Sequence, residues 1–129
     1  MKNAMCIEDL RRIARRNVPR VFIDYMEAGS YSERTRDANV EDMAKVKLRQ
    51  RVLVDVSHRS MATRVLGEQL SMPLALAPTG LAGMQHADGE ILAARAAHAA
   101  GVQFCQSTMS ICSVEDVAEA VQKPFWFQL

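Results

Sequence analysis

Three short polar side chains stand where three apolar segments of the sequence end. Thr79 follows the apolar run 74–77, Ser107 ends the segment VQFCQS, and Gln128 ends the segment FWFQL. If these segments are parallel strands, their ends share the edge of the sheet at which α/β proteins bind ligands. Two hydroxyls and an amide there could hydrogen-bond a polar heteroaromatic ligand, although each could also be an ordinary turn residue.

The turn formed by Pro78, Thr79 and Gly80 leaves the same choice open. It could be a plain strand-to-helix turn, or a backbone shaped to lie against a ligand. The GLAGM sequence around it lacks the Gly-Lys-Ser/Thr ending of a Walker A motif and does not match GxGxxG. Phosphate binding is therefore not expected in this loop.

Few other side chains indicate chemistry. Tyr25 lies in a helical pattern, where an aromatic residue more often packs in a core than binds a substrate carboxylate through its hydroxyl. His58, His86 and His98 have no metal-ligand spacing, and no Ser-His-Asp or Cys-His arrangement is visible. The three cysteines are an odd number without a CxxC pair, which argues against zinc and disulfides and favours a reducing compartment. We expect no metal site.

From Met72 onward, strand and helix patterns alternate. The strand 74–77 is followed by a helix that is predicted to begin near Asp88 and to end at Gly101. After the strand VQFCQS, a capping box of Ser113 and Asp116 opens the next helix, and FWFQL is the third strand. Nearly continuous apolar strands separated by helices predict an α/β fold with a parallel sheet.

The sequence divides into three segments. Residues 1–50 have helical periodicity, with one helix in CIEDLRRIARRNVP, a second that starts at Pro19 as its first residue, and a third in VEDMAKVKL. Residues 51–71 contain RVLVDVS and TRVLGEQLS, which predict a small hairpin or an extended pair. Residues 72–129 contain the alternating strands and helices.

Composition excludes several classes. The chain has 129 residues, 49% of them hydrophobic, and a net charge of +1, which fits a globular protein and gives no argument for nucleic acid. No segment resembles a membrane span or a signal peptide, so a cytoplasmic protein is expected. The chain stops inside or at the edge of its third strand, whereas a doubly wound sheet would need more strands and a TIM barrel would need eight, over about 250 residues. We therefore expect this chain to be the N-terminal part of a longer protein.

Several blocks of sequence, in this order, resemble the FMN-dependent 2-hydroxy acid dehydrogenase/oxidase family, which includes glycolate oxidase, mandelate dehydrogenase and flavocytochrome b2. The blocks are DYMEAGSYSERT, NVEDMAKVKLRQRVL, SMPLALAPTGLAGM, GEILAARAAHAAGV, STMSICSVEDVA and FWFQL. The branch that they resemble most is that of the bacterial respiratory L-lactate dehydrogenases. The resemblance implies the N-terminal portion of a TIM (β/α)8 barrel, about three strands, preceded by helices and by a small β-hairpin that closes the barrel base.

The resemblance also implies roles for individual residues. Tyr25 corresponds to the tyrosine that hydrogen-bonds the substrate carboxylate. The cofactor FMN would be contacted by Pro78, Thr79 and Gly80 along its ring, by the Ser107 hydroxyl, and by the Gln128 amide at its pyrimidine side. The catalytic histidine of the family lies in a His-Gly-Gly-Arg-type motif that is absent here. No catalytic residue is therefore expected in this chain, and we expect it to be inactive alone.

The implied reaction of the parent enzyme is oxidation of L-lactate to pyruvate, with electrons passed to a respiratory quinone or cytochrome. The alternatives are a glycolate or mandelate enzyme of the same family, a non-catalytic truncated product, and an unrelated small α/β binding domain. The full-length parent could be a homo-oligomer. The arginine-rich run RRIARR predicts a solvated helix face, with peripheral contact to the inner face of the cell membrane as its alternative.

Overall fold

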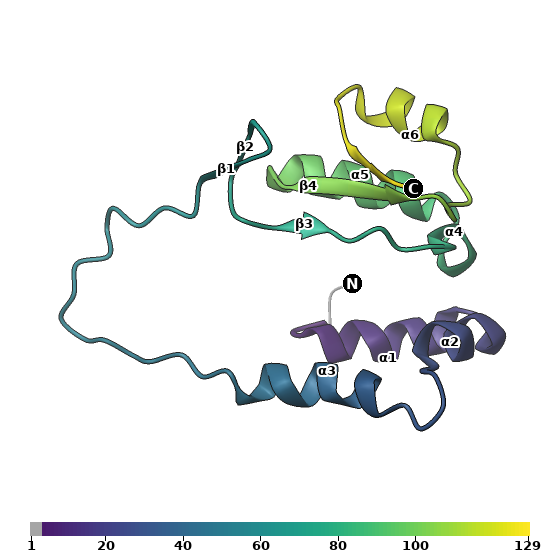
Figure 1. Ribbon diagram of the computed structural model, residues 1–129, viewed down its shortest axis with the longest axis horizontal. Coiled ribbons are helices and arrows are strands. Elements are labelled where there is room, and N and C mark those ends of the chain that lie inside the picture. Colours follow the sequence, from purple (N-terminus) through teal and green to yellow (C-terminus); the bar gives the residue numbers. More distant parts are fainter. Residues whose placement is uncertain (1–3) are drawn as a thin grey trace. The chain divides into compact units, whose positions relative to one another are not determined.

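The computed structural model describes residues 4–129, and the chain forms two compact units, residues 1–58 and 59–129 (Figure 1). The first unit is helical. The second unit contains a hairpin, a parallel sheet and helices. In chain order the elements are α1 (Ile7–Asn17), α2 (Arg20–Glu27), α3 (Arg34–Lys45), β1 (Thr63–Val65), β2 (Glu68–Leu70), β3 (Ala75–Leu76), α4 (Ala82–Gln85), α5 (Gly89–Ala100), β4 (Gln103–Ser107), α6 (Val114–Val121) and β5 (Trp126–Gln128).

The first unit contains the three predicted helices, but two of their starts differ from the prediction. Pro19 is the N-cap of α2 rather than its first residue, because its ψ of 139° is extended and the helical backbone begins one residue later. α3 covers 34–45, whereas the sequence predicted a helix over 40–48. The earlier start is supported by the Arg36 guanidinium, which contacts the carboxylates of Glu33 and Asp37 across the first turn.

The predicted strand RVLVDVS at 51–57 is wrong. Between α3 and β1 the described chain has no helix or strand. Leu53 adopts a φ of 57°, which interrupts the extended backbone that its β-branched neighbours favour. The hairpin instead forms within TRVLGEQL, where β1 and β2 pair antiparallel around Leu66 and Gly67. Both turn residues have positive φ, 48° and 86°, as a two-residue hairpin turn requires.

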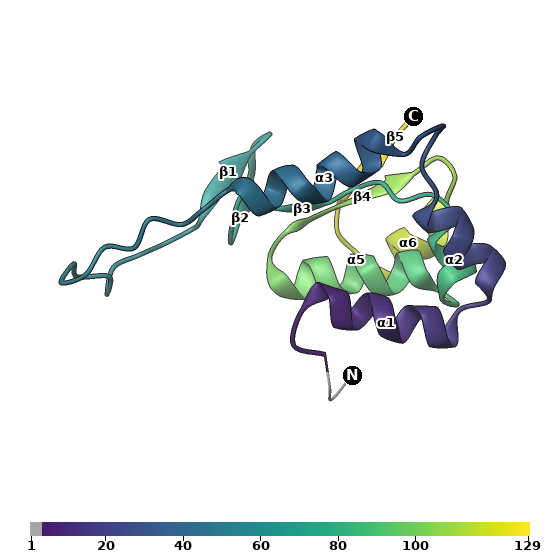
Figure 2. The same ribbon diagram turned by 90° about the horizontal axis from the view of Figure 1, so that it is seen from below.

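The sheet of the second unit confirms the predicted parallel α/β arrangement. Its strand order is β3-β4-β5, and both strand pairs are parallel. Figures 1 and 2 show α5 and α6 on the same side of these strands. The predicted ends of α5 are confirmed, with Asp88 as N-cap and Gly101 as C-cap, and so is the capping box of Ser113 and Asp116 on α6.

The core of the second unit lies between α5, α6 and β4. Its buried members are Ala94, Ala97, Val102, Phe104 and Val117. Two alanines on one face of α5 leave room for the large Phe104 ring, whose centroid lies 6.0 Å from that of Phe125. This packing fixes β4, and with it the position of the strand ends described below.

Replacing Gly101 by alanine is expected to destabilise the second unit by about 2–4 kcal/mol, because two costs add. Gly101 has a φ of 67°, and a Cβ there would lie 2.1 Å from the Ser71 Oγ atom. The matched control is Gly67→Ala, where φ is 86° but no atom lies within 4 Å, so only the conformational cost of about 1 kcal/mol applies. Urea denaturation of both variants measures the difference, and equal losses would contradict the contact with Ser71.

Candidate functional site

The ends of β4 and β5 bring two of the predicted site residues into contact. Ser107 and Gln128 are register partners in the parallel pair. The Ser107 hydroxyl donates to Gln128 Oε1 at 3.3 Å and accepts the Met109 N–H at 3.1 Å, while the Thr108 hydroxyl donates to the Gln128 backbone carbonyl. Ser107 is buried and Gln128 is exposed, so a fixed hydroxyl holds an amide that faces solvent.

The loop after β3 lies against the same strand ends. A Cβ built on Gly80 would lie 3.1 Å from the Met109 Cβ and 3.8 Å from the Ser107 Oγ. The Leu81 N–H donates to the Met109 carbonyl at 2.8 Å, which joins the loops that follow β3 and β4. Gly80, Ser107 and Gln128 therefore form a continuous row, which we call the strand-end edge.

Thr79 and Pro78 flank this row. Thr79 is exposed, and its hydroxyl donates to the Ala77 carbonyl at 3.3 Å, which shapes the turn. Thr79 and Ser107 also line a cavity of about 170 Å³ between the β3 and β4 strand ends, α4 and α5. Pockets that enclose drug-sized ligands measure about 300–1,000 Å³, so a large planar ligand would lie along the strand-end edge rather than inside this cavity.

Sequence reasoning missed Glu90, the second residue of α5. It is 2% exposed, and its Oε1 accepts hydrogen bonds from the Gly83 N–H at 3.1 Å and the Ile111 N–H at 3.0 Å. Burial acts to raise the pKa of Glu90, but the N–H of Ile111 and further donors outweigh it and lower the pKa. The only signal in the sequence was an acidic residue in a first helical turn, which usually faces solvent.

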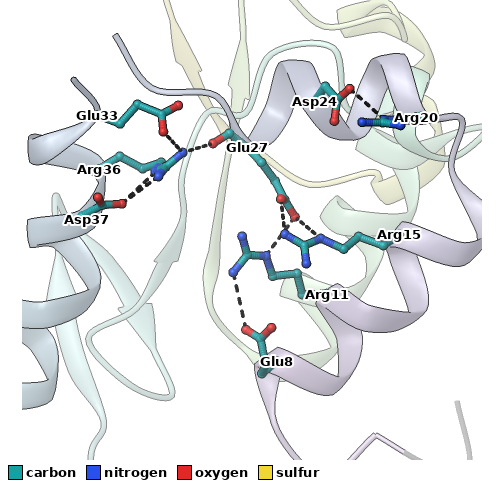
Figure 3. A network of polar contacts seen from close by, with 9 residues as sticks. All are labelled: Glu8, Arg11, Arg15, Arg20, Asp24, Glu27, Glu33, Arg36 and Asp37. Carbon is teal, nitrogen blue, oxygen red and sulfur yellow. Dashed lines mark hydrogen bonds and ion pairs between the residues drawn. The ribbon is translucent and has the colours of Figure 1, made fainter. Parts of the chain in front are cut away.

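Tyr25 belongs to the first unit, where it is 66% exposed on α2. It is therefore not a core residue of that unit. Two residues along, Glu27 joins α2 to α1, accepting from the Arg11 Nε at 2.8 Å and the Arg15 Nε at 3.0 Å (Figure 3). Arg36 of α3 donates to the Glu27 backbone carbonyl at 3.1 Å. Glu27 is the last residue of α2, the helix that carries Tyr25, and its contacts connect α2 to both α1 and α3.

The Glu27 contacts predict a loss of stability in acid. Hydrogen bonds from Arg11 and then Arg15 lower the pKa of Glu27 from 4.5 to about 2. Because the folded pKa is the lower one, this stabilisation is complete above about pH 4.5 and is lost as the pH falls through about 2. Glu8 pairs with Arg11 at 3.7 Å, and Arg36 meets the backbone carbonyl of Glu27 rather than its carboxylate.

Glu27→Gln should remove this contribution at neutral pH, so the variant's α1 and α2 should unfold at lower urea concentration than those of the unchanged chain. In acid the two proteins should converge. The measurement is the urea midpoint of the α1 and α2 amide signals at about pH 7 and about pH 2. An equal midpoint at neutral pH would show that the ion pairs contribute nothing measurable.

The described residues hold neither a metal cluster nor a membrane-spanning helix. Within residues 4–129, no cluster of three or more His, Cys, Asp or Glu side chains could hold a metal ion. No helix in that range is long and apolar enough to cross a membrane. The cysteines Cys6, Cys105 and Cys112 are unpaired thiols.

Curated relatives cover the chain almost completely. It is 50% identical over 121 residues to an L-lactate dehydrogenase of Chromohalobacter salexigens, covering 94% of this chain and 31% of that protein. It is 51% identical to an L-lactate dehydrogenase of Caulobacter vibrioides, covering 94% of this chain and 32% of that protein. The chain thus spans about a third of the length of the curated relatives that it matches.

Solved structures agree with the fold. A soluble mutant of the membrane-associated (S)-mandelate dehydrogenase from Pseudomonas putida matches with a TM-score of 0.90 and 39% identity, covering 98% of this chain and 36% of that one. A mandelate oxidase matches with a TM-score of 0.89 and 32% identity, covering 98% and 37%. These relatives are TIM-barrel enzymes, and the three parallel strands correspond to part of their barrel, as the sequence predicted.

The family comparison covers most of the chain. Residues 14–129 match the FMN-dependent dehydrogenase family. This range contains the end of α1, the helices α2 and α3, the hairpin and the whole parallel sheet. The strand-end edge lies entirely within this match. The chain therefore belongs to the FMN-dependent dehydrogenase family.

Proposed function

We propose that this chain forms one wall of the FMN site of an enzyme that oxidises a 2-hydroxy acid, with L-lactate as the substrate. The observation that carries the proposal is the strand-end edge. It places a hydroxyl and an amide side by side on a chain that matches the FMN-dependent dehydrogenase family over residues 14–129. The choice of lactate is supported by the L-lactate dehydrogenases that share 50–51% identity with the chain.

The donor set of the strand-end edge fits FMN. The pyrimidine side of a flavin presents both carbonyl oxygens and an N–H group, so it needs donors and acceptors together. Gln128 carries both in one side chain, and the hydrogen bond from Ser107 to its Oε1 fixes its orientation. Gly80, without a side chain, allows the backbone after β3 to approach a flat ring closely. FMN, when bound, accepts the hydrogen removed from the substrate.

Different residues of this chain are proposed to bind the cofactor and the substrate. We infer that Gln128 and Ser107 hold and orient the pyrimidine side of FMN, and that Pro78, Thr79 and Gly80 provide a backbone surface along its ring. Tyr25 donates its hydroxyl hydrogen to the substrate carboxylate, a role supported by its exposure on α2. We assign neither the proton-accepting base nor a substrate arginine to a residue of this chain.

We further propose that residues 1–50 carry the substrate-binding tyrosine, that 51–71 close the barrel base, and that 72–129 supply the first barrel strands. The Gln103 amide donates to the Glu68 carboxylate at 2.8 Å, which ties the hairpin to the start of β4 and supports the second of these assignments. A respiratory quinone or cytochrome is the proposed electron acceptor. Attachment to the inner face of the cell membrane is supported by the monotopic membrane relative, an (S)-mandelate dehydrogenase.

The test is a fusion protein in which this chain replaces the matching part of the Chromohalobacter salexigens L-lactate dehydrogenase. The fusion should bind FMN, and L-lactate should bleach its flavin absorbance faster than glycolate or (S)-mandelate does. The unmodified dehydrogenase is the control. A fusion that folds without binding FMN would exclude the flavin wall, and faster bleaching by (S)-mandelate would exclude lactate as the substrate.

A further inference from the structure

Glu90 joins helix α4 to the loop after β4 through hydrogen bonds to its side chain. Its Oε1 accepts one hydrogen bond from Gly83 in α4 and one from Ile111 in the loop after β4, at 3.1 and 3.0 Å. These partners lie 7 and 21 residues away along the chain. A single buried oxygen atom therefore bridges the two segments.

The two segments also touch at other points. A Cβ built on Gly83 would lie 2.6 Å from the Ile111 Cβ, and one on Gly80 would lie 3.1 Å from the Met109 Cβ. Between these contacts, the Leu81 N–H donates to the Met109 carbonyl at 2.8 Å. Glu90 holds one end of this contact, and the strand-end edge lies at the other.

Met109 connects the contact between the two segments to the strand-end edge. Its carbonyl accepts from Leu81, while its own N–H donates to the Ser107 hydroxyl at 3.1 Å. The same hydroxyl donates to Gln128 Oε1 at 3.3 Å. A shift of the loop after β4 would therefore change the direction of the Ser107 hydroxyl and, through it, of the Gln128 amide.

The charge of Glu90 strengthens its contacts. No ion pair to Glu90 is present among residues 4–129, and the donors that favour its charged form are the backbone N–H groups of Ile111, Gly83 and Glu90 itself and the neighbouring Cys112 thiol. It also lies in the first turn of α5, where the helix favours a negative charge. Hydrogen bonds to an ionised carboxylate are about twice as strong as neutral ones.

We infer that Glu90 is a positioning residue: it locks the loops after β3 and β4 together and so sets the strand-end edge against which FMN lies. This inference rests on the proposed function, because the edge matters only if it meets the flavin. Glu90 touches neither Ser107 nor Gln128 directly, and it acts on them through Leu81 and Met109.

Amide hydrogen exchange of the 129-residue chain tests the inference without any flavin. Glu90→Gln keeps the side chain's size but removes the charge. It should speed exchange about tenfold or more at Gly83 and Ile111, which Glu90 contacts, and also at Leu81 and Met109, which it does not. The α5 interior amides of Ala94 and Ala97 should keep their protection.

The matched control is Glu119→Gln, which neutralises an exposed carboxylate of the same unit and should change none of these rates. Equal acceleration throughout the second unit would mean that Glu90 only stabilises the fold. Acceleration confined to Gly83 and Ile111, or none at all, would equally overturn the inference. If Glu90→Gln does not fold, Glu90→Asp takes its place, since it keeps the charge but is too short to meet both donors.

A second measurement uses the fusion protein and its FMN affinity. Glu90→Gln and Ser107→Ala should each weaken FMN binding several-fold. The double variant should weaken it by less than the product of these two fold-changes, because both substitutions act through the Ser107 hydroxyl. Independent, multiplicative losses would contradict the coupling. If the unchanged fusion binds no FMN, the proposed function fails, whereas the exchange result still decides whether Glu90 couples the loops.

Discussion

Replacing Phe104 by alanine is expected to unfold the second unit or leave it barely stable. Removing a buried phenylalanine ring costs about 3–5 kcal/mol, and a whole domain has only about 5–15 kcal/mol of stability. Phe104 is 4% exposed, packs beside Ala94, Ala97 and Val117, and lies against the Phe125 ring. These neighbours belong to α5, to α6 and to the segment just before β5, so they cannot collapse together into the cavity that the substitution leaves.

The measurement is urea denaturation followed by the fluorescence of Trp126, the single tryptophan of the chain, which lies on β5. The matched control is Phe127→Ala, because Phe127 is 48% exposed on the same strand as the probe. We expect it to cost less than about 1 kcal/mol. Similar losses for both variants would contradict the assignment of Phe104 to the core.

Replacing Gln128 by leucine is expected to weaken FMN binding by the fusion protein about 10- to 100-fold, because polar flavin atoms would lose their partners and meet an apolar side chain instead. Leucine is similar in size to glutamine, so the edge keeps its shape while its donor and acceptor are lost. The hydrogen bond from Ser107 loses its acceptor as well. Fluorescence titration with FMN measures the dissociation constant.

Gln69→Leu serves as the control for Gln128→Leu. Gln69 is exposed on β2 of the hairpin, away from the strand-end edge, so the same chemical change there should leave FMN affinity unaltered. A second control is the melting temperature without FMN, which Gln128→Leu should lower only slightly, because Gln128 is exposed and the Ser107 hydroxyl keeps its contact with the Met109 N–H. Unchanged FMN affinity in a folded Gln128→Leu fusion would remove Gln128 from the proposed site.

Local chemistry was enough to predict much of the second unit. The ends of α5 followed from Asp88 and Gly101, and the start of α6 followed from the capping box of Ser113 and Asp116. These signals act within one helical turn, so no knowledge of distant residues is needed to interpret them. The three strands were visible as short apolar runs between helical patterns, although only β4 is largely buried in the structure.

The strand predicted at 51–57 did not form, because its local sequence pattern has no neighbouring strand to pair with among residues 4–129. The alternating valines of RVLVDVS favour a strand, but a strand forms only when another strand or an apolar face pairs with it, and the described chain offers none there. α3 began earlier than predicted because the contacts of Arg36 with Glu33 and Asp37 support its first turn. The short helix α4, placed in a loop by the sequence, follows Leu81, whose N–H is held by the Met109 carbonyl.

The amino-acid sequence by itself determined the family, the alternation of strands and helices, and the polar residues at the strand ends, because each is written in a run of neighbouring residues. Only the tertiary structure decided that Ser107 meets Gln128, 21 residues away, and that Glu90 is buried between Gly83 and Ile111. Such contacts depend on how the elements pack, and an acidic residue in a first helical turn has the same sequence pattern whether it is exposed or buried.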